Sequence, residues 1–80
     1  MILTIDIGNT NITFGVFDGD KLSFVSRLAT ERNRTDDQFA VEFLAVFKMN
    51  DLERAEIIGA VLSCVVPELT GKIKRAVSKA

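Results

Sequence analysis

Near its start the chain carries a carboxylate, a glycine and three small polar side chains in an order that suits phosphate binding. Asp6 lies within an apolar run, which breaks into Gly8, Asn9, Thr10 and Asn11 before apolar residues resume. Glycine tolerates a positive φ angle and lets a ligand approach the main chain closely. The amides of such a turn can surround an anion, and the Asn and Thr side chains add donors. We interpret this segment as a turn that holds a nucleotide phosphate, with Asp6 ordering Mg²⁺ through water.

Both features also have a purely structural interpretation. Asp6 could cap the turn that follows it, and glycine, asparagine and threonine are common in ordinary hairpin turns. An unpaired acid within an apolar strand is costly to bury, however, so its position favours a functional role. The segment is not a P-loop, because the sequence G-x-x-x-x-G-K-[ST] is absent.

A second polar segment, residues 29–34, contains Arg32 and Arg34 just before a predicted helix. Two arginines in this position could contact an anionic ligand. Such loops are more often simply solvated, and we favour that interpretation here. Cys64 lies in an apolar run without a neighbouring positive charge, which indicates a small buried side chain rather than a reactive thiol.

The composition excludes several other kinds of site. The chain has 80 residues, no histidine and one cysteine, so it cannot by itself build a His/Cys metal site, a Ser–His–Asp triad or a Cys–His pair. A lone cysteine fits a reducing, cytoplasmic location. The formal net charge of −1 argues against nucleic-acid binding. We expect neither a signal peptide nor a segment that crosses a membrane.

The strands that must position Asp6 follow from the apolar pattern. Residues 2–7, 12–17 and 21–28 are predicted to form three successive antiparallel strands. In the first strand the odd-numbered apolar residues share one face, and Asp6 lies on the other face with Thr4. The phosphate-binding turn is therefore expected to be the first hairpin of an antiparallel sheet.

The second hairpin and the third strand give further expectations. Asp18-Gly19 is a dipeptide that favours a two-residue hairpin turn. In the third strand, Leu22, Phe24 and Leu28 are expected on one side of the sheet and Arg27 on the other.

The second half of the chain predicts two helices around a further strand. Thr35-Asp36-Asp37-Gln38 is a capping-box pattern, and phenylalanines at helical spacing continue a helix to about Met49. Residues 57–66 form an apolar run that suits a strand covered on both faces and parallel to the first. Pro67 is expected to open a second helix, whose buried face would be formed by Leu69, Ile73, Ala76, Val77 and Ala80. The order is β-β-β-α-β-α, and the free edge of the last strand predicts a longer protein.

Three stretches together resemble the type III pantothenate kinase family of the acetate-and-sugar-kinase/actin superfamily. Residues 6–11 with Gly15 are similar to the family's phosphate motif, D-x-G-N-T-N-x-x-x-G. Residues 30–39 are similar to its T-x-x-x-R-T-x-D-[EQ] segment, with Arg34 as the family arginine. Residues 62–67 are similar to its S-S-V-V-P strand end, with Cys64 in place of the second serine.

The resemblance implies a ribonuclease-H-like α/β half-domain over residues 1–80 that binds nucleotide phosphates, and a second domain outside this sequence. It implies ATP-dependent phosphorylation of pantothenate, the first step of coenzyme A biosynthesis. It also implies Mg²⁺, a monovalent cation (K⁺ or NH₄⁺) and a homodimer. Asp6 is the implied metal ligand, and the implied cofactor-binding residues are Asp6, Ile7, Gly8, Asn9, Thr10, Asn11, Ile12 and Thr13.

The resemblance places no catalytic residue within this chain. The family's G-x-D-R motif supplies the aspartate that takes the proton from the pantothenate hydroxyl, and its equivalent is expected beyond Ala80. We therefore expect the isolated chain to be inactive or nearly so. Two alternatives stay open, a non-catalytic accessory protein of the same fold and a structural fragment without activity of its own. The acid at Asp6 favours the enzyme, because a purely regulatory relative has no need to keep it.

Overall fold

Three antiparallel strands begin the structure, a computed structural model that describes residues 1–80. A helix, a short 3₁₀ turn, a fourth strand and a second helix follow them. The predicted order β-β-β-α-β-α is confirmed, and the fold is of the α/β class. The elements are β1 (Ile2–Ile7), β2 (Asn11–Asp18), β3 (Lys21–Ala29), α1 (Asp36–Met49), a 3₁₀ turn (Arg54–Glu56), β4 (Gly59–Cys64) and α2 (Pro67–Lys79).

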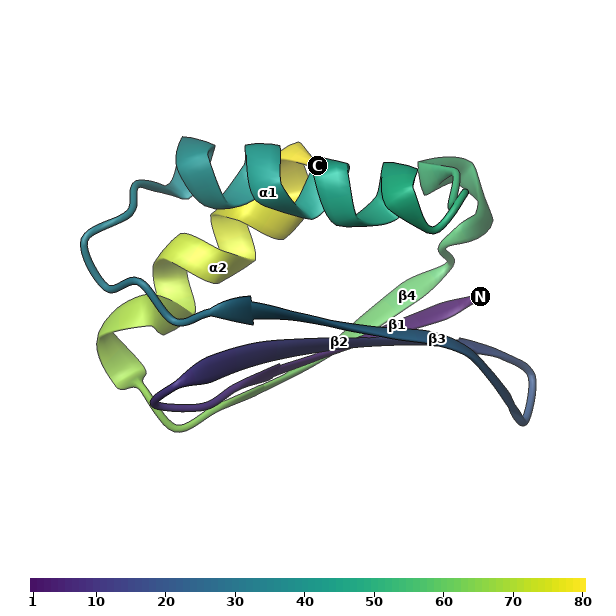
Figure 1. The fold of residues 1–80 in the computed structure, drawn as a ribbon, viewed down its shortest axis with the longest axis horizontal. Helices are drawn as coiled ribbons and strands as arrows, with labels where there is room; N and C mark the ends of the chain where they lie inside the picture. Colours follow the sequence, from purple (N-terminus) through teal and green to yellow (C-terminus); the bar gives the residue numbers. More distant parts are fainter.

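The four strands form one sheet in the order β3-β2-β1-β4, in which β4 runs parallel to β1 as predicted. Figure 1 shows that both helices lie over the same face of this sheet. The apolar residues on that face of β1, Leu3, Ile5 and Ile7, are buried. We call the opposite face, which no helix covers, the open face of the sheet.

The core forms between the covered face of the sheet and the helices. Phe14 of β2 contacts Phe43 of α1 edge to face, with ring centroids 4.8 Å apart. The predicted phenylalanine stripe of α1 and the predicted apolar face of α2 are both confirmed. Their buried residues are Phe39, Phe43, Phe47, Leu69, Ile73, Ala76 and Ala80, and Val77 is partly buried.

Both helices begin where the sequence predicts. The Gln38 amide donates to the Thr35 hydroxyl (3.2 Å), and the Gln38 side chain accepts from the Thr35 amide (2.8 Å), so the capping box is complete. Pro67 occupies the first turn of α2, where its missing N–H costs nothing. Neither helix combines the length and apolar character that crossing a membrane requires.

Three details of the sheet differ from the sequence prediction. The second hairpin turns at Gly19 and Asp20, one residue later than expected, with positive φ (62°) at Gly19. The pairing of β2 with β3 is irregular between Val16 and Phe17, and this places Leu22 opposite Phe17 on the open face instead of beside Phe24. Leu22 is therefore exposed, because Ser23 is an extra residue in the pairing and moves its neighbour Leu22 to the other face.

Strand β4 is also less covered than its apolar sequence predicts. Val61, on the open face of β4, is 60% exposed, whereas Leu62 and Cys64 on the other face are partly buried. The strand lies at the edge of the sheet, and the two helices cover only one face. An apolar run indicates burial on both faces only when elements are present on both.

Ion pairs join the first turn of α1 to the end of α2. Arg75 Nε lies 3.2 Å from Asp36 Oδ2, and Lys79 contacts both Asp36 and Asp37. Desolvation raises the pKa of Asp36, but the Arg75 hydrogen bond and the nearby positive charges outweigh it, so this pKa lies below its ordinary value. The hydrogen bond with Asp37 raises the pKa of Lys79 against the opposing effect of desolvation.

Candidate functional site

The side chain of Asp6 lies exposed on the open face, near the end of β1. In the sheet register Asp6 is opposite Thr13 of β2 on one side and Ser63 of β4 on the other. A carboxylate is thus flanked by two hydroxyl side chains at the same level of three neighbouring strands. Thr13 belongs to the site predicted from the sequence, whereas Ser63 does not, because its place beside Asp6 depends on the parallel pairing of β4.

No hydrogen bond or ion pair within the chain engages the Asp6 carboxylate. The structural interpretation, in which Asp6 caps the turn that follows, is therefore not what the fold contains. The carboxylate is solvated and free to accept from a ligand. Because Asp6 is exposed, the cost of burying an unpaired acid, which the sequence suggested, does not arise, and the case for a binding role depends on the missing partner and on the neighbouring turn.

The turn between β1 and β2 is narrow and held by main-chain hydrogen bonds. The Gly8 amide donates to the Asn11 carbonyl at 2.9 Å. A Cβ atom on Gly8 would lie 3.2 Å from that same oxygen, so the turn needs a small residue there because of close approach. The positive φ angle that glycine also permits is not used at Gly8. Asn9, Thr10 and Asn11 are all exposed.

The remaining residues of the predicted site face different ways. Ile7 and Ile12 are fully buried in the core, so only their main-chain atoms could serve a ligand. The Ile7 carbonyl already accepts from the Val65 amide at 3.0 Å. Thr13 is partly buried next to Asp6. The side chains that the fold leaves available are therefore those of Asp6, Asn9, Thr10, Asn11 and Thr13.

The polar connection between β3 and α1 contacts this turn. The Thr30 hydroxyl donates to the Gly8 carbonyl at 2.8 Å, and the Thr30 amide donates to the Thr10 carbonyl at 2.9 Å. Arg32 Nη2 donates to Asn9 Oδ1 at 3.0 Å. Arg32 is exposed, as expected for a solvated loop, but Thr30 and Arg32 also contact the turn, which that interpretation did not include. Polar composition could not reveal the contact, because it arises only when β3 returns beside the turn (Figure 1).

The other arginine of this connection has a different partner. Arg34 forms an ion pair with Glu42 of α1, and its Nε atom is buried without a partner. Lys72 of α2 donates to the main-chain carbonyls of Arg32 (3.3 Å) and Arg34 (3.1 Å). Arg34 and Lys72 thus tie the connection to the helices, whereas Arg32 is the arginine that reaches the turn.

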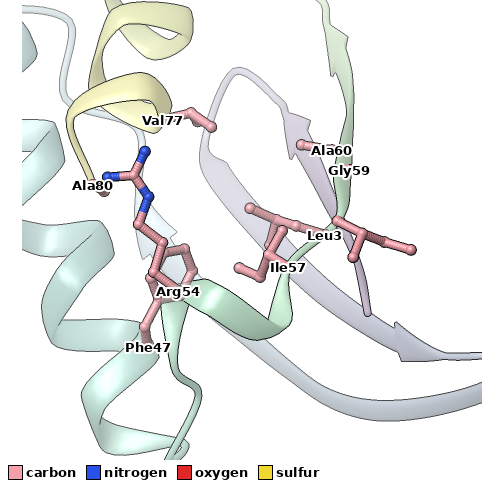
Figure 2. A pocket seen from close by; sticks show the side chains of 9 residues that line it. Leu3, Phe47, Arg54, Ile57, Gly59, Ala60, Val77 and Ala80 are labelled. Carbon is pink, nitrogen blue, oxygen red and sulfur yellow. The ribbon is translucent and has the colours of Figure 1, made fainter.

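A cavity of about 240 Å³ lies at the opposite end of β1 from Asp6 (Figure 2). Its walls include Leu3, Phe47, Ile57 and Val77, with Arg54 as the charged residue. It contains no acid and no turn of free amides, so its chemistry does not suit phosphate transfer. The free carboxylate and the exposed Asn and Thr side chains mark the turn end of the sheet as the better candidate.

The fold and this site together define an α/β protein with a free carboxylate beside a narrow polar turn. The family model of type III pantothenate kinase matches residues 2–80. The chain belongs to the type III pantothenate kinase family.

Similar proteins carry the same family name. The chain is 45% identical over 74 residues to a type III pantothenate kinase of Roseiflexus sp. (strain RS-1), and 43% identical over 74 residues to that of Roseiflexus castenholzii. It is 39% identical over 75 residues to that of Geobacter sulfurreducens. These matches cover 92–94% of this chain but 29% of the length of each relative.

Proposed function

We propose that the intact protein transfers a phosphoryl group from ATP to pantothenate, the first step of coenzyme A biosynthesis. Membership of the type III pantothenate kinase family supports a kinase that uses ATP and pantothenate. The observation that carries the proposal at the level of residues is the free Asp6 carboxylate beside the narrow polar turn. Because the chain spans 29% of its relatives' length, we assign it one part of the reaction. The carboxylate and the turn point to phosphate binding as that part.

The donor set of the turn fits a hydrated magnesium ion. No three acidic, histidine or cysteine side chains gather anywhere in the structure, so the chain does not enclose a metal in a cage of its own side chains. Mg²⁺ usually keeps several waters and binds one or two carboxylates together with substrate phosphates. Asp6 would hold it, and when bound it would neutralise charge on the phosphates. By resemblance to the family, we assign the site of the monovalent cation to the second domain.

In this proposal the turn binds the ATP phosphates. Asn9, Thr10 and Asn11 offer exposed side-chain donors. Gly8 allows the narrow turn that presents them, because its missing Cβ leaves room for the Asn11 carbonyl. Ile7 and Ile12 would act through their main-chain atoms, and Thr13 would border the metal ligand Asp6. Phosphoryl transfer depends mainly on positioning and on electrostatic stabilisation, which is what a rigid turn of donors supplies.

The second half of the reaction lies outside the chain. By resemblance, the acceptor of the pantothenate proton belongs to a G-x-D-R motif beyond Ala80. We propose a cytoplasmic homodimer on the same ground.

The test is pantothenate-dependent release of ADP by the protein expressed from its intact reading frame, with Mg²⁺ and K⁺ present. Replacing Asp6 by asparagine is expected to lower kcat/KM by about 100-fold or more, because a group that stabilises developing charge is removed. Asp20→Asn is the matched control, since Asp20 is an exposed acid in the hairpin at the other end of β2. Its activity should stay unchanged.

Two results would contradict the proposal in different ways. An Asp6→Asn protein with normal activity would remove Asp6 from the site but leave the kinase. A folded intact protein without activity would instead favour the non-catalytic accessory protein of the same fold.

A further inference from the structure

Arg32 makes a contact with the phosphate turn that the proposed function leaves unexplained. Its Nη2 atom donates to Asn9 Oδ1 at 3.0 Å, and its Nε atom lies 3.2 Å from Glu68 Oε1 in the first turn of α2. One guanidinium therefore bridges an asparagine of the β1–β2 turn and an acid of α2. The three residues are 23 and 36 positions apart along the chain, so only the fold brings them together.

The chemistry of this contact fixes the orientation of the Asn9 side chain. A guanidinium has donors and no acceptor, so the carboxamide must present its oxygen to Arg32. The NH₂ group of Asn9 then occupies the other branch of the same planar amide, where it makes no hydrogen bond within the chain. A phosphate oxygen is an acceptor, so a free NH₂ group is the end of the amide that it can use.

We propose that Arg32 is a positioning residue, which holds the Asn9 amide with its donors free for the nucleotide phosphate. This inference rests on the proposed function, because it assumes that the turn binds a phosphate. Without Arg32 the amide can rotate and present its oxygen to the anion, which that oxygen would repel. Glu68 forms an exposed ion pair with the same guanidinium and balances its charge, so in this proposal Arg32 acts through Asn9 rather than as a free cation.

The role needs the geometry of arginine as well as its charge. The Nε and Nη2 atoms lie on the same side of the planar guanidinium, and each serves a different partner here. A lysine has a single ammonium group on a flexible stem and cannot reproduce two fixed contacts. Arg32→Lys therefore separates charge from geometry, and we expect it to behave like Arg32→Met.

The experiment measures kcat, KM for ATP and KM for pantothenate in the intact protein and in Arg32→Met, Asn9→Ala and the double variant. Arg32→Met is expected to raise KM for ATP about tenfold, the effect of losing one well-placed hydrogen bond to a charged group. KM for pantothenate should stay unchanged. The double variant should match Asn9→Ala alone, because Arg32 has nothing left to orient once the amide is gone.

Arg54→Met is the matched control. Arg54 is an exposed arginine that contacts the Ser78 carbonyl. It lines the cavity at the opposite end of β1 from the turn (Figure 2). An unchanged KM for ATP in Arg32→Met would overturn the proposal. So would a double variant whose defect is the product of the two single defects, since Arg32 would then act independently of Asn9.

A second measurement separates this inference from the proposed function. If the intact protein shows no kinase activity, the ¹⁵N side-chain amide signal of Asn9 is followed by NMR while MgATP is added. A response in the unmodified protein that is lost in Arg32→Met supports the positioning role without any catalysis. An equal response in both proteins, or none in either, overturns it.

Discussion

Asp6 and Asn9 lie three residues apart, yet only one of their side chains has a hydrogen-bond partner within the chain. The Asp6 carboxylate has no partner within the chain, whereas Arg32 holds the Asn9 carboxamide by its oxygen. An unpaired carboxylate suits a group that binds a metal ion and its waters, and a fixed amide suits one that must present donors in one direction. The two side chains therefore divide the work of the proposed site between metal binding and orientation.

Thr30 is the residue on which the shape of the turn most clearly depends. Its hydroxyl donates to the partly buried Gly8 carbonyl at 2.8 Å. Replacing it with the isosteric valine should lower the free energy of unfolding by about 1 kcal/mol, because the carbonyl loses its donor. Chemical denaturation measures this change, with Thr70→Val as the control, since Thr70 is a half-buried threonine of α2 without a side-chain hydrogen bond. Equal effects in the two variants would show that the bond contributes nothing specific.

At the scale of elements, α1 and α2 are joined by charge as well as by their apolar faces. The acids Asp36 and Asp37 lie in the first turn of α1, where the helix dipole favours negative charge, and they meet Arg75 and Lys79 of α2. These pairs are partly exposed, so they adjust the contact between the helices more than they create it. The buried residues Phe39, Phe43, Leu69 and Ile73 supply the larger part of the packing.

These pairs predict how stability depends on pH. Because the folded-state pKa of Asp36 is lowered, its contribution is present above the ordinary carboxyl pKa of 3.8 and is lost as the pH falls through the lower folded value. In Asp36→Asn this loss should disappear, so Tm should fall less steeply than in the unmodified protein below about pH 4. Thermal unfolding between pH 2 and about pH 7 measures the difference, expected to be a few degrees. Asp20 forms no ion pair, so Asp20→Asn should leave the fall of Tm at low pH unchanged.

The pKa of Lys79 is shifted in the opposite direction from that of Asp36, so it affects stability at alkaline pH. Its stabilisation is present below the ordinary lysine value of 10.5 and is lost as the pH rises through the folded value. For Asp36, the contradicting result is at low pH. If Tm falls equally with pH in Asp36→Asn and in the unmodified protein, this group of ion pairs does not control acid stability.

At the scale of the whole molecule, the sheet has one face covered by helices and one open face. The helices cover one side of the sheet, while Val61, Leu22 and Val25 are exposed on the other, and β4 lies at the sheet edge. Asp6 lies on this open face near the β1–β2 turn. In the proposed function the phosphates bind at this turn, and the open face beside it, where a second substrate would lie, is not covered by any element of the chain.

This arrangement predicts that the 80-residue chain by itself does not phosphorylate pantothenate. Transfer requires two substrates held in line, and in the proposed function this chain supplies donors for the nucleotide alone. ADP release by the isolated chain should stay at background under conditions in which the intact protein is active, and folding of the chain is checked by circular dichroism. Activity of the isolated chain that disappears in Asp6→Asn would overturn the prediction.

The sequence alone determined the elements and the motif, because both depend on local patterns. Thr35 and Gln38 predicted the start of α1, Pro67 predicted the start of α2, and the alternation in β1 placed Asp6 opposite the core. These signals are local, since caps and alternating faces involve residues a few positions apart. The same holds for the order of residues 6–11, which pointed to the family before any contact was known.

Tertiary structure decided which distant side chains meet at the turn. Ser63 reached Asp6 through the register of a parallel pair, and Arg32 reached Asn9 because β3 returns beside the turn. An irregular pairing moved Leu22 to the open face, which no alternation pattern reveals. Register and loop path depend on packing across the whole sheet rather than on neighbouring residues. That is why the sequence pointed to Asp6 and the turn, whereas only the fold revealed the residues that hold the turn in place.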